Sequence, residues 1–340
     1  NMKNTAHPYL FTTIILVITI LLSVVVGSVA TPLKDVISVF GEGIRNGFSD
    51  QTTPLASIIF KLRLPRTILI ALTGAALASS GAAYQGLFRN PLADPYVIGV
   101  ASGSGLGAVI AMSIHWPNGW TSSFITPVAA FIMGLITVLL VYSLSRVNRS
   151  VPATSLVLAG VAISSFTTAI TSFVMLKSTG ELRRSLVWLL GGSTLSGWQP
   201  VIGMLPYVAL GIGTLLTMGY TLNVFQFGDE QATQMGLKVE KRRLIVIIAA
   251  SLTTAAAVSF SGVIGFVGLI TPHIIRLLTG GDYRRILPLS TIAGAAFLLL
   301  ADILARVVLA PQEVPVGIIT ALAGAPFFIW VLRRSRPEEV

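Results

Sequence analysis

Residues 244–280, LIVIIAASLTTAAAVSFSGVIGFVGLITPHIIRLLTG, form a nearly unbroken apolar stretch that decides the class of fold. A helix needs roughly 20 apolar residues to cross a bilayer, so this stretch is too long for one membrane span and long enough for two. The glycine-containing segment 259–265, SFSGVIG, is the natural place for a break. We therefore predict two consecutive membrane-spanning helices, near residues 244–260 and 262–280.

The composition extends this prediction to the whole chain. Of the 340 residues, 54% are hydrophobic and 11% are charged, whereas a soluble domain has about 25% charged residues and a disordered chain has low hydrophobicity. We expect an all-α, polytopic membrane protein with a single transmembrane domain over residues 2–340. Asn1 precedes the apparent start methionine, Met2, and is set aside as an addition. The ten predicted spans lie near residues 9–31, 67–88, 96–114, 124–145, 153–176, 200–222, 244–260, 262–280, 286–306 and 314–332.

Several kinds of chemistry are excluded by what the sequence lacks. There is no cysteine, and the three histidines lie far apart, which argues against a metal site. The dipeptide Gly-Lys occurs nowhere, so there is no phosphate-binding loop for ATP. The net charge of +10 fits lysines and arginines gathered in cytoplasmic loops better than nucleic-acid binding. We expect the chain to bind no cofactor, metal or nucleic acid, and to depend on another polypeptide for energy from ATP.

The positive charges also predict the orientation in the membrane. With the N-terminus inside, most of the 23 lysines and arginines fall in inner segments, so we expect both termini in the cytoplasm. Arg63, Arg66 and Arg306 are exceptions at the outer face. Each has two possible reasons: a carboxylate partner on another protein, or a side chain that reaches toward lipid headgroups.

Within the ten predicted spans, only Asp302 and Arg306 interrupt an apolar run near the outer end. Their spacing of four residues, acid first, is favourable for an ion pair on a helix. An acid within a span also marks ion-coupled carriers. Two rival functions therefore stay open: an ion-coupled secondary transporter using Asp302, and a membrane scaffold that transports nothing.

Three further segments point to the faces of the membrane. Residues 226–243, QFGDEQATQMGLKVEKRR, contain Asp229 and Glu230 between two glycines, which predicts a short helix lying along the cytoplasmic face; a solvated loop is the alternative. Residues 86–95, GLFRNPLADP, predict a proline-fixed turn at the inner mouth, a possible gate. Basic clusters at 61–66 and 238–243 precede the second and seventh spans, which run in opposite directions, as in inverted repeats.

Three long segments resemble the FecCD-type permeases: LPRTILIALTGAALASSGAAYQGLFRNPLADPYVIGVASGSGLGA (64–108), GDEQATQMGL (228–237), and residues 261–332 beginning SGVIGFVGLITPHIIRLLTGGDYRR. These permeases are the membrane subunits of importers for iron–siderophores, haem and vitamin B12. The resemblance implies a type II ABC importer permease with ten helices and an inverted-repeat core, in a bacterial or archaeal inner membrane. It also implies a second permease subunit, two cytoplasmic ATPase subunits that use ATP and Mg²⁺, and an extracytoplasmic substrate-binding protein.

The resemblance also assigns expected roles to individual residues. Arg63, Arg66 and Arg306 match arginines that pair with glutamates on the two lobes of the binding protein. Asn90 and Leu92 match an inner gate loop. Thr154 lies near a second gate, where the pattern departs because Ala153 stands in place of an expected hydroxyl residue. The segment that couples to the ATPase comprises Gly228, Asp229, Glu230, Gln231, Ala232, Thr233, Gln234, Met235, Gly236 and Leu237.

Overall fold

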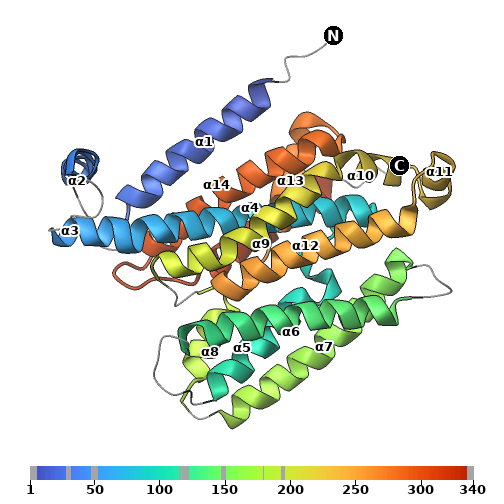
Figure 1. Ribbon diagram of the computed structural model, residues 1–340, viewed down its shortest axis with the longest axis horizontal. Coiled ribbons are helices and arrows are strands. Elements are labelled where there is room, and N and C mark those ends of the chain that lie inside the picture. The colour runs from blue at the N-terminus through green and yellow to red at the C-terminus, as the bar shows by residue number, and fades with distance from the viewer. Residues whose placement is uncertain are drawn as a thin grey trace.

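The computed structural model shows an assembly of helices, and every regular element in its described part is helical (Figure 1). The all-α fold expected from the sequence is confirmed. Asn1, Met2, the end of the first predicted span at 28–31, and residues 335–340 lie outside the described part. The described residues are 6–27, 32–46, 53–114, 116, 122–146, 151–178, 180–192 and 196–334.

The helices fall into a central group, a side group and short surface elements. In chain order they are α1 (Ala6–Val25), α2 (Leu33–Asn46), α3 (Pro54–Ser57), the π-helix η1 (Ile58–Arg63), α4 (Leu64–Phe88), the 3₁₀-helix η2 (Pro95–Ile98), α5 (Val100–Ser113), α6 (Ser122–Leu144), α7 (Ala153–Lys177), α8 (Leu182–Leu189), α9 (Trp198–Thr217), α10 (Gly219–Phe225), α11 (Asp229–Gln234), α12 (Val239–Ser261), α13 (Val267–Thr279), α14 (Tyr283–Val307) and α15 (Val316–Arg334).

Helix α4 is the centre of the molecule, and α14, α12 and α13 pack against it. All side chains from Ala76 to Leu87 are buried. Small residues make this possible, because they let helix backbones approach closely. Gly74 lies against the backbone of Gly294, and Gly81 lies against Gly268; a Cβ atom at either α4 position would overlap a carbonyl oxygen of the neighbouring helix. The small-residue segment therefore serves helix packing.

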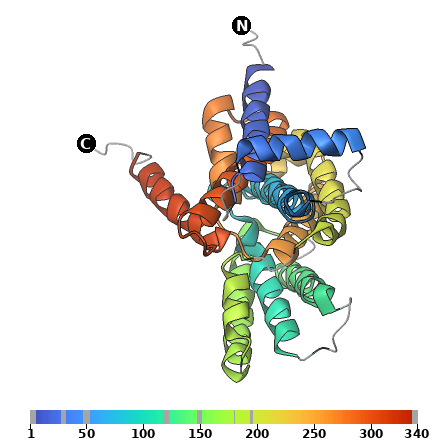
Figure 2. The same ribbon diagram turned by 90° about the vertical axis from the view of Figure 1, so that its left-hand side faces the viewer.

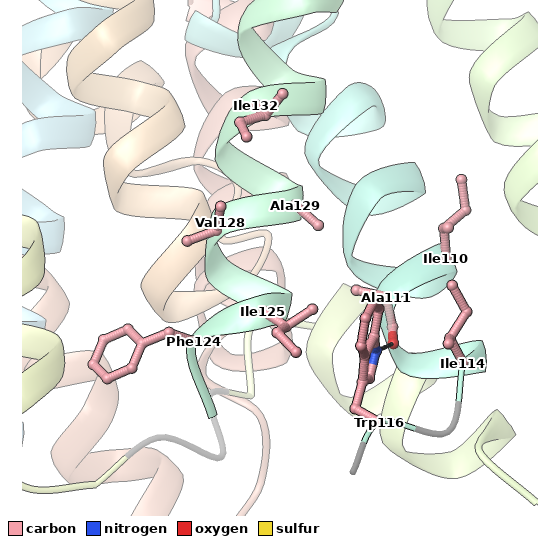
Figure 3. Close-up of a pocket in the computed structure, with 9 residues that line it drawn as sticks. All are labelled: Ile110, Ala111, Ile114, Trp116, Phe124, Ile125, Val128, Ala129 and Ile132. Atoms are coloured by element: carbon pink, nitrogen blue, oxygen red, sulfur yellow. Dashed lines mark hydrogen bonds between the residues drawn. The ribbon is translucent and has the colours of Figure 1, made fainter. Parts of the chain in front are cut away.

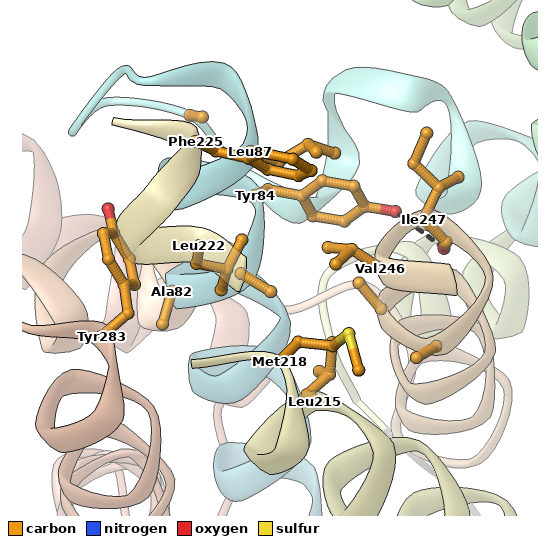
Figure 4. Close-up of a cluster of buried hydrophobic side chains, with 14 of the residues drawn as sticks. Ala82, Tyr84, Leu87, Leu215, Met218, Leu222, Phe225, Val246, Ile247 and Tyr283 are labelled. Carbon is orange, nitrogen blue, oxygen red and sulfur yellow. Dashed lines mark hydrogen bonds between the residues drawn. The ribbon is translucent and has the colours of Figure 1, made fainter. Parts of the chain in front are cut away.

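Helices α4 and α12 run antiparallel, as their hydrogen bonds show. The hydroxyls of Thr73 and Ser261 lie 2.6 Å apart. The Ser80 hydroxyl donates to the Ala250 carbonyl at 3.1 Å, and the hydroxyls of Tyr84 and Ser251 lie 2.8 Å apart. Thus residue numbers fall along α12 as they rise along α4, the relation expected for the second and seventh spans. Figure 4 shows the apolar core around the Tyr84 ring at the end of α4.

Helices α5, α6, α7 and α8 form a side group on the face of α4 and α12 opposite to α1 (Figures 1 and 2). Helices α5 and α6 approach closely at two glycines of α5. Gly103 lies against Thr137, and Gly107 lies against the carbonyl of Ala129. The glycine repeat in the sequence thus marks a helix–helix contact.

Each of the ten predicted spans overlaps at least one helix in the described part of the chain. The break within 244–280 lies between the end of α12 at Ser261 and the start of α13 at Val267. The range 200–222 is divided into α9 and α10 at Met218, which the sequence analysis did not foresee. Within the described part, α1, α6, α7, α9, α12 and α14 are long and apolar enough to cross a membrane, and α5, α13 and α15 are shorter apolar helices. The number of ten spans stays a prediction.

Candidate functional site

The predicted outer and inner residues lie at opposite ends of the helix bundle. Helix α3, which leads into the segment carrying Arg63 and Arg66, is at one end, and α11 is at the other (Figure 1). We name the first the outer end and the second the inner end, after the orientation expected from the sequence. Arg306 is in the last turn of α14, beside the first two arginines. Among the described residues, the predicted docking arginines and the predicted coupling segment are therefore separated into two groups at opposite ends.

At the outer end, Asp302 is fully buried between two guanidinium groups. The Arg66 Nη2 lies 2.9 Å from Asp302 Oδ1, and the Arg306 Nη2 lies 3.0 Å from Asp302 Oδ2. Arg66 also reaches Glu313, with 2.7 Å between Nη1 and Oε2. A cavity of about 180 Å³ borders Arg66, Asp302 and Glu313. The predicted pair of Asp302 and Arg306 is thus part of a four-residue charge cluster.

Arg63 and Arg306 bind the last carbonyl groups of α1. Arg63 Nη1 donates to the carbonyls of Val24 and Val25 at 3.2 and 2.9 Å. Arg306 Nη1 donates to those of Ser23 and Val26 at 3.0 and 2.8 Å. The final carbonyls of a helix have no partner within it, so these bonds complete the end of α1.

The structure therefore adds a third reason for arginines at this end, besides a partner's carboxylates and lipid headgroups. Arg63 and Arg306 are 8% and 3% exposed, whereas the Arg66 side chain is 35% exposed. Of the three predicted docking residues, only Arg66 offers substantial surface to another protein in this conformation. No local pattern signals the contacts with α1, because the contacting residues are 38 to 283 positions apart in the sequence.

At the inner end, α11 lies where the sequence predicts a short helix. It follows Gly228, whose φ of +99° favours glycine, and only Ala232 of its residues is buried. Gly228 and Leu237 are half-buried. The other residues of the predicted coupling segment are exposed: Asp229, Glu230, Gln231, Thr233, Gln234, Met235 and Gly236. The segment thus presents a projecting polar surface anchored by one apolar residue.

The predicted gate loop is a compact turn that ends α4. The Leu92 backbone N–H donates to Asn90 Oδ1 at 2.9 Å, and both residues are exposed. Two residues later, half-buried Asp94 caps η2 by accepting a hydrogen bond from the Tyr96 backbone N–H at 2.7 Å. Burial raises the pKa of Asp94 to about 6, although the bond from Tyr96 lowers this pKa. Asp94 is a titratable group of this loop that the sequence analysis missed.

Residues 226–243, which include the coupling segment, contact both predicted gate regions. Gln226 Nε2 donates to the carbonyl of Gly86, near the end of α4, at 2.9 Å. On the other side, Arg243 Nη2 lies 2.6 Å from Asp229 Oδ2, and its Nη1 donates to the Val151 carbonyl at 3.0 Å. Val151 lies just before α7, whose first turn contains exposed Thr154. The structure thus connects Gln226, just before α11, to the gate loop, and it connects α11 through Arg243 to the start of α7.

An apolar groove between α5 and α6 is distinct from both charged ends (Figure 3). It has a volume of about 730 Å³, and its lining includes Ile114, Trp116 and Phe124. The Trp116 indole N–H is directed to the Ala111 carbonyl at 2.7 Å. The lining therefore leaves no free polar group to orient a ligand. In the described part of the chain, no group of three or more His, Cys, Asp or Glu residues is placed to hold a metal ion.

Comparison with known proteins places this arrangement in a family. The model of the FecCD transport family matches residues 15–334. The chain belongs to the FecCD transport family. This FecCD protein is 42% identical over 324 residues to the uncharacterized ABC transporter permease protein YvrB of Bacillus subtilis, covering 94% of this chain and 91% of YvrB. The fold and the assignment as an importer permease expected from the sequence are confirmed.

Other relatives of this FecCD protein carry names that refer to particular cargoes. It is 45% identical over 276 residues to the cobalamin import system permease protein BtuC of Halobacterium salinarum, covering 81% of this chain and 73% of that one. It is 38% identical over 288 residues to the hemin transport system permease protein HmuU of Yersinia pestis, covering 83% of this chain and 84% of HmuU. A solved structure described as an inward-facing metal-chelate type ABC transporter has a TM-score of 0.81 and 30% identity, covering 97% of this chain and 99% of that chain.

Proposed function

We propose that this chain is the membrane subunit through which an ATP-driven importer moves a large metal chelate into the cell. It would work in the inner membrane with both termini in the cytoplasm, in a homodimer or with a similar second permease subunit. Two cytoplasmic ATPase subunits would bind ATP and Mg²⁺, and an extracytoplasmic binding protein would deliver the cargo. The permease performs no covalent chemistry, and access alternates between the two sides of the membrane.

The observation that carries this proposal is the position of α11. Its residues are exposed except for Ala232, so nearly the whole helix is free to enter a groove on a partner. At the same time, Gln226 and Arg243, on either side of α11, connect residues 226–243 to the end of α4 and to the start of α7 through hydrogen bonds and an ion pair. A surface that binds an ATPase and also contacts both gate regions is suited to convert movement of the partner into a change of access.

The outer charge cluster supports docking of a binding protein through Arg66. Its Nη1 is held by Glu313, whose side chain is 40% exposed. A carboxylate on a binding protein could replace that of Glu313, since the guanidinium group forms directional pairs with carboxylates. Arg63 and Arg306 would act in docking only after releasing carbonyls of α1. While these bonds are intact, Arg63 and Arg306 would not contact the binding protein directly.

The cargo is proposed as a class. Relatives named for cobalamin and hemin share 45% and 38% identity with the chain, and both cargoes are large metal chelates, as are iron–siderophores. The binding protein would provide selective capture, because tight binding within the path would slow release of the cargo.

The environment of Asp302 does not favour the rival secondary transporter. Ion coupling requires an acid that exchanges a proton or cation with water during the cycle. The Asp302 side chain is 0% exposed and is paired with Arg66 and Arg306. These contacts fit a charge-compensated structural acid.

Co-purification of the ATPase subunits tests the proposal. Deletion of residues 229–235 should abolish co-purification, and Gln231→Arg should weaken it at least tenfold, because Gln231 is exposed on α11. The matched control is Ser38→Arg on α2, which adds the same charge at an exposed position at the other end. An intact complex in the deletion variant would reject the coupling role of α11.

A further inference from the structure

Arg243 connects three parts of the inner end although it is almost completely buried. Its side chain is 8% exposed, and it lies in the first turns of α12. Nη2 pairs with Asp229 on α11 at 2.6 Å, and Nη1 pairs with Glu240 at 2.9 Å. The same Nη1 donates to the Val151 carbonyl at 3.0 Å. One guanidinium group therefore joins α11, α12 and the segment that leads into α7.

The geometry requires an arginine. A planar guanidinium group presents donors in several fixed directions, whereas the lysine ammonium group is a compact point charge. A buried cation is stable only when it is paired and hydrogen-bonded. The side chains of Asp229 and Glu240 are 49% and 43% exposed, so water could solvate them elsewhere. Water cannot replace the partners of the buried Arg243 side chain in the same way, so these contacts hold α11 close to α12.

The third contact of Arg243 is directed at the start of α7. Val151 is 1% exposed, and the next residue, Pro152, precedes the first residue of α7. A proline nitrogen has no hydrogen to donate, so this segment is held by the bond to the Val151 carbonyl, by the packing of Val151, and by the Ser145 hydroxyl, which donates to the Ser155 carbonyl at 3.1 Å. If the guanidinium group moved alone, it would leave a buried carbonyl without this hydrogen-bond partner, which is unfavourable. Arg243 and the start of α7 should therefore move together.

We propose that Arg243 is the positioning residue that transmits movement of α11 to α7. A force on α11 displaces Asp229, and Arg243 transfers this displacement to Val151 and thereby to the first turn of α7, where Thr154 lies. This inference rests on the proposed function, because it assumes that an ATPase moves α11. It adds a specific route, through a single buried side chain, from the cytoplasmic surface to the second predicted gate.

The apolar contact of Ala232 is the alternative route. Ala232 is 0% exposed and belongs to the same buried cluster as Val151 and Leu156. If packing alone carried the movement, neutral replacements of Arg243 or Asp229 would leave coupling intact. The two routes therefore make different predictions for the same variants.

The test compares transport with ATP hydrolysis in the complete complex, reconstituted in proteoliposomes with its ATPase and binding protein. In Arg243→Gln, the complex should still hydrolyse ATP, while the number of ATP molecules used per imported cargo rises at least fivefold, the lower end of typical coupling between sites. Arg243→Lys should give a smaller increase. The matched control is Arg284→Gln, since Arg284 also pairs with an aspartate, Asp282, but is 66% exposed; its ratio should not change.

A second variant keeps the proposal testable if Arg243→Gln does not assemble. Asp229→Asn removes the ion pair between α11 and Arg243, and it should raise the ratio less in the Arg243→Lys background than in the wild-type background. An unchanged ratio in Arg243→Gln would overturn the proposal. So would equal losses of hydrolysis and transport in that variant, or additive effects of Asp229→Asn and Arg243→Lys. Failure of the proposed function would look different, because the wild-type complex would then show no ATP-dependent import.

Discussion

Asp302 shows how a single residue organises the outer end. Its carboxylate has no exposed surface, and its charge is balanced by Arg66 from α4 and Arg306 from its own helix. Removing one member of such a buried cluster leaves the other charges without compensation. The residue therefore has a structural role that does not depend on ion transport.

Asp302→Asn should lower the free energy of unfolding by about 3–5 kcal/mol, because it leaves two guanidinium groups near an uncharged amide. Thermal unfolding in detergent measures this loss. Glu313→Gln is the control, since Glu313 is 40% exposed and an exposed pair contributes only about 0–1 kcal/mol. Equal melting temperatures for Asp302→Asn and the wild type would contradict the structural role.

Asp94 should make stability depend on pH. Its pKa is raised from 3.8 to about 6 in the folded protein, so between these values the folded chain holds a proton that the unfolded chain has released. The contribution of this group to stability is therefore complete below pH 4 and is lost as the pH rises through about 6. Relative to Asp94→Asn, the melting temperature of the wild type should fall between pH 4 and 7. If the melting temperatures of the wild type and Asp94→Asn changed with pH in parallel, Asp94 would not titrate in this range.

Sequence reasoning at the residue scale found neighbours along a helix and missed partners distant in sequence. The spacing of Asp302 and Arg306 was sufficient to predict their ion pair, which is confirmed. Arg66 is 236 positions from Asp302, and no local pattern signals that contact. The bonds from Arg63 and Arg306 to the end of α1 were missed for the same reason.

At the scale of the helix, the position of α4 depends on its glycines. Gly81 lies where a Cβ atom would overlap the backbone of Gly268 on α13. Backbone atoms cannot move aside as the end of a flexible side chain can. The close contact of the two helices therefore requires glycine at this position.

Gly81→Ala should destabilise the protein by about 1–3 kcal/mol, the usual cost of overpacking a well-packed core. Gly213→Ala in α9 is the matched control, because a Cβ atom there would meet nothing within 4 Å. The control should stay within about 1 kcal/mol of the wild type. Thermal unfolding of both variants measures the difference. Equal destabilisation would show that the close contact of α4 and α13 does not require glycine at position 81.

Helix ends were predictable where the sequence contains a local signal. Gly228 and the acidic pair that follows it predicted α11, and the glycine-containing segment 259–265 predicted the end of α12. The division between α9 and α10 at Met218 was missed although Gly219 follows it directly, because one glycine within an apolar run is a weak break signal. The π-helix η1 before α4 was also missed. Its Phe60 carbonyl accepts a hydrogen bond from the Trp198 indole N–H at 2.9 Å, and Trp198 is too distant in sequence for a local pattern to signal this contact.

At the scale of the whole molecule, the charge cluster around Asp302 and the exposed residues of α11 lie at opposite ends of the described part. The sequence predicted this separation from the orientation of the spans. It could not predict which outer arginines are accessible, because accessibility depends on how α1 packs against α14. Docking should therefore depend most directly on Arg66.

Arg66→Gln should weaken binding-protein docking and make the remaining affinity less sensitive to salt, because one charged pair across the interface is lost. The affinity measured at two salt concentrations tests both effects. Lys34→Gln on α2 removes one exposed positive charge at the same end and serves as the control. Equal losses in both variants would indicate that general charge, and not Arg66, guides docking.

The most direct test of the importer function is uptake of a metal chelate by proteoliposomes that contain the permease and its ATPase. We predict uptake only when ATP is on the ATPase side and the binding protein is on the other, with no requirement for a proton or sodium gradient. Asp302→Asn should reduce the amount of stable protein without creating a dependence on such a gradient. Uptake driven by an ion gradient in the absence of ATP, and abolished by Asp302→Asn, would contradict the proposed function.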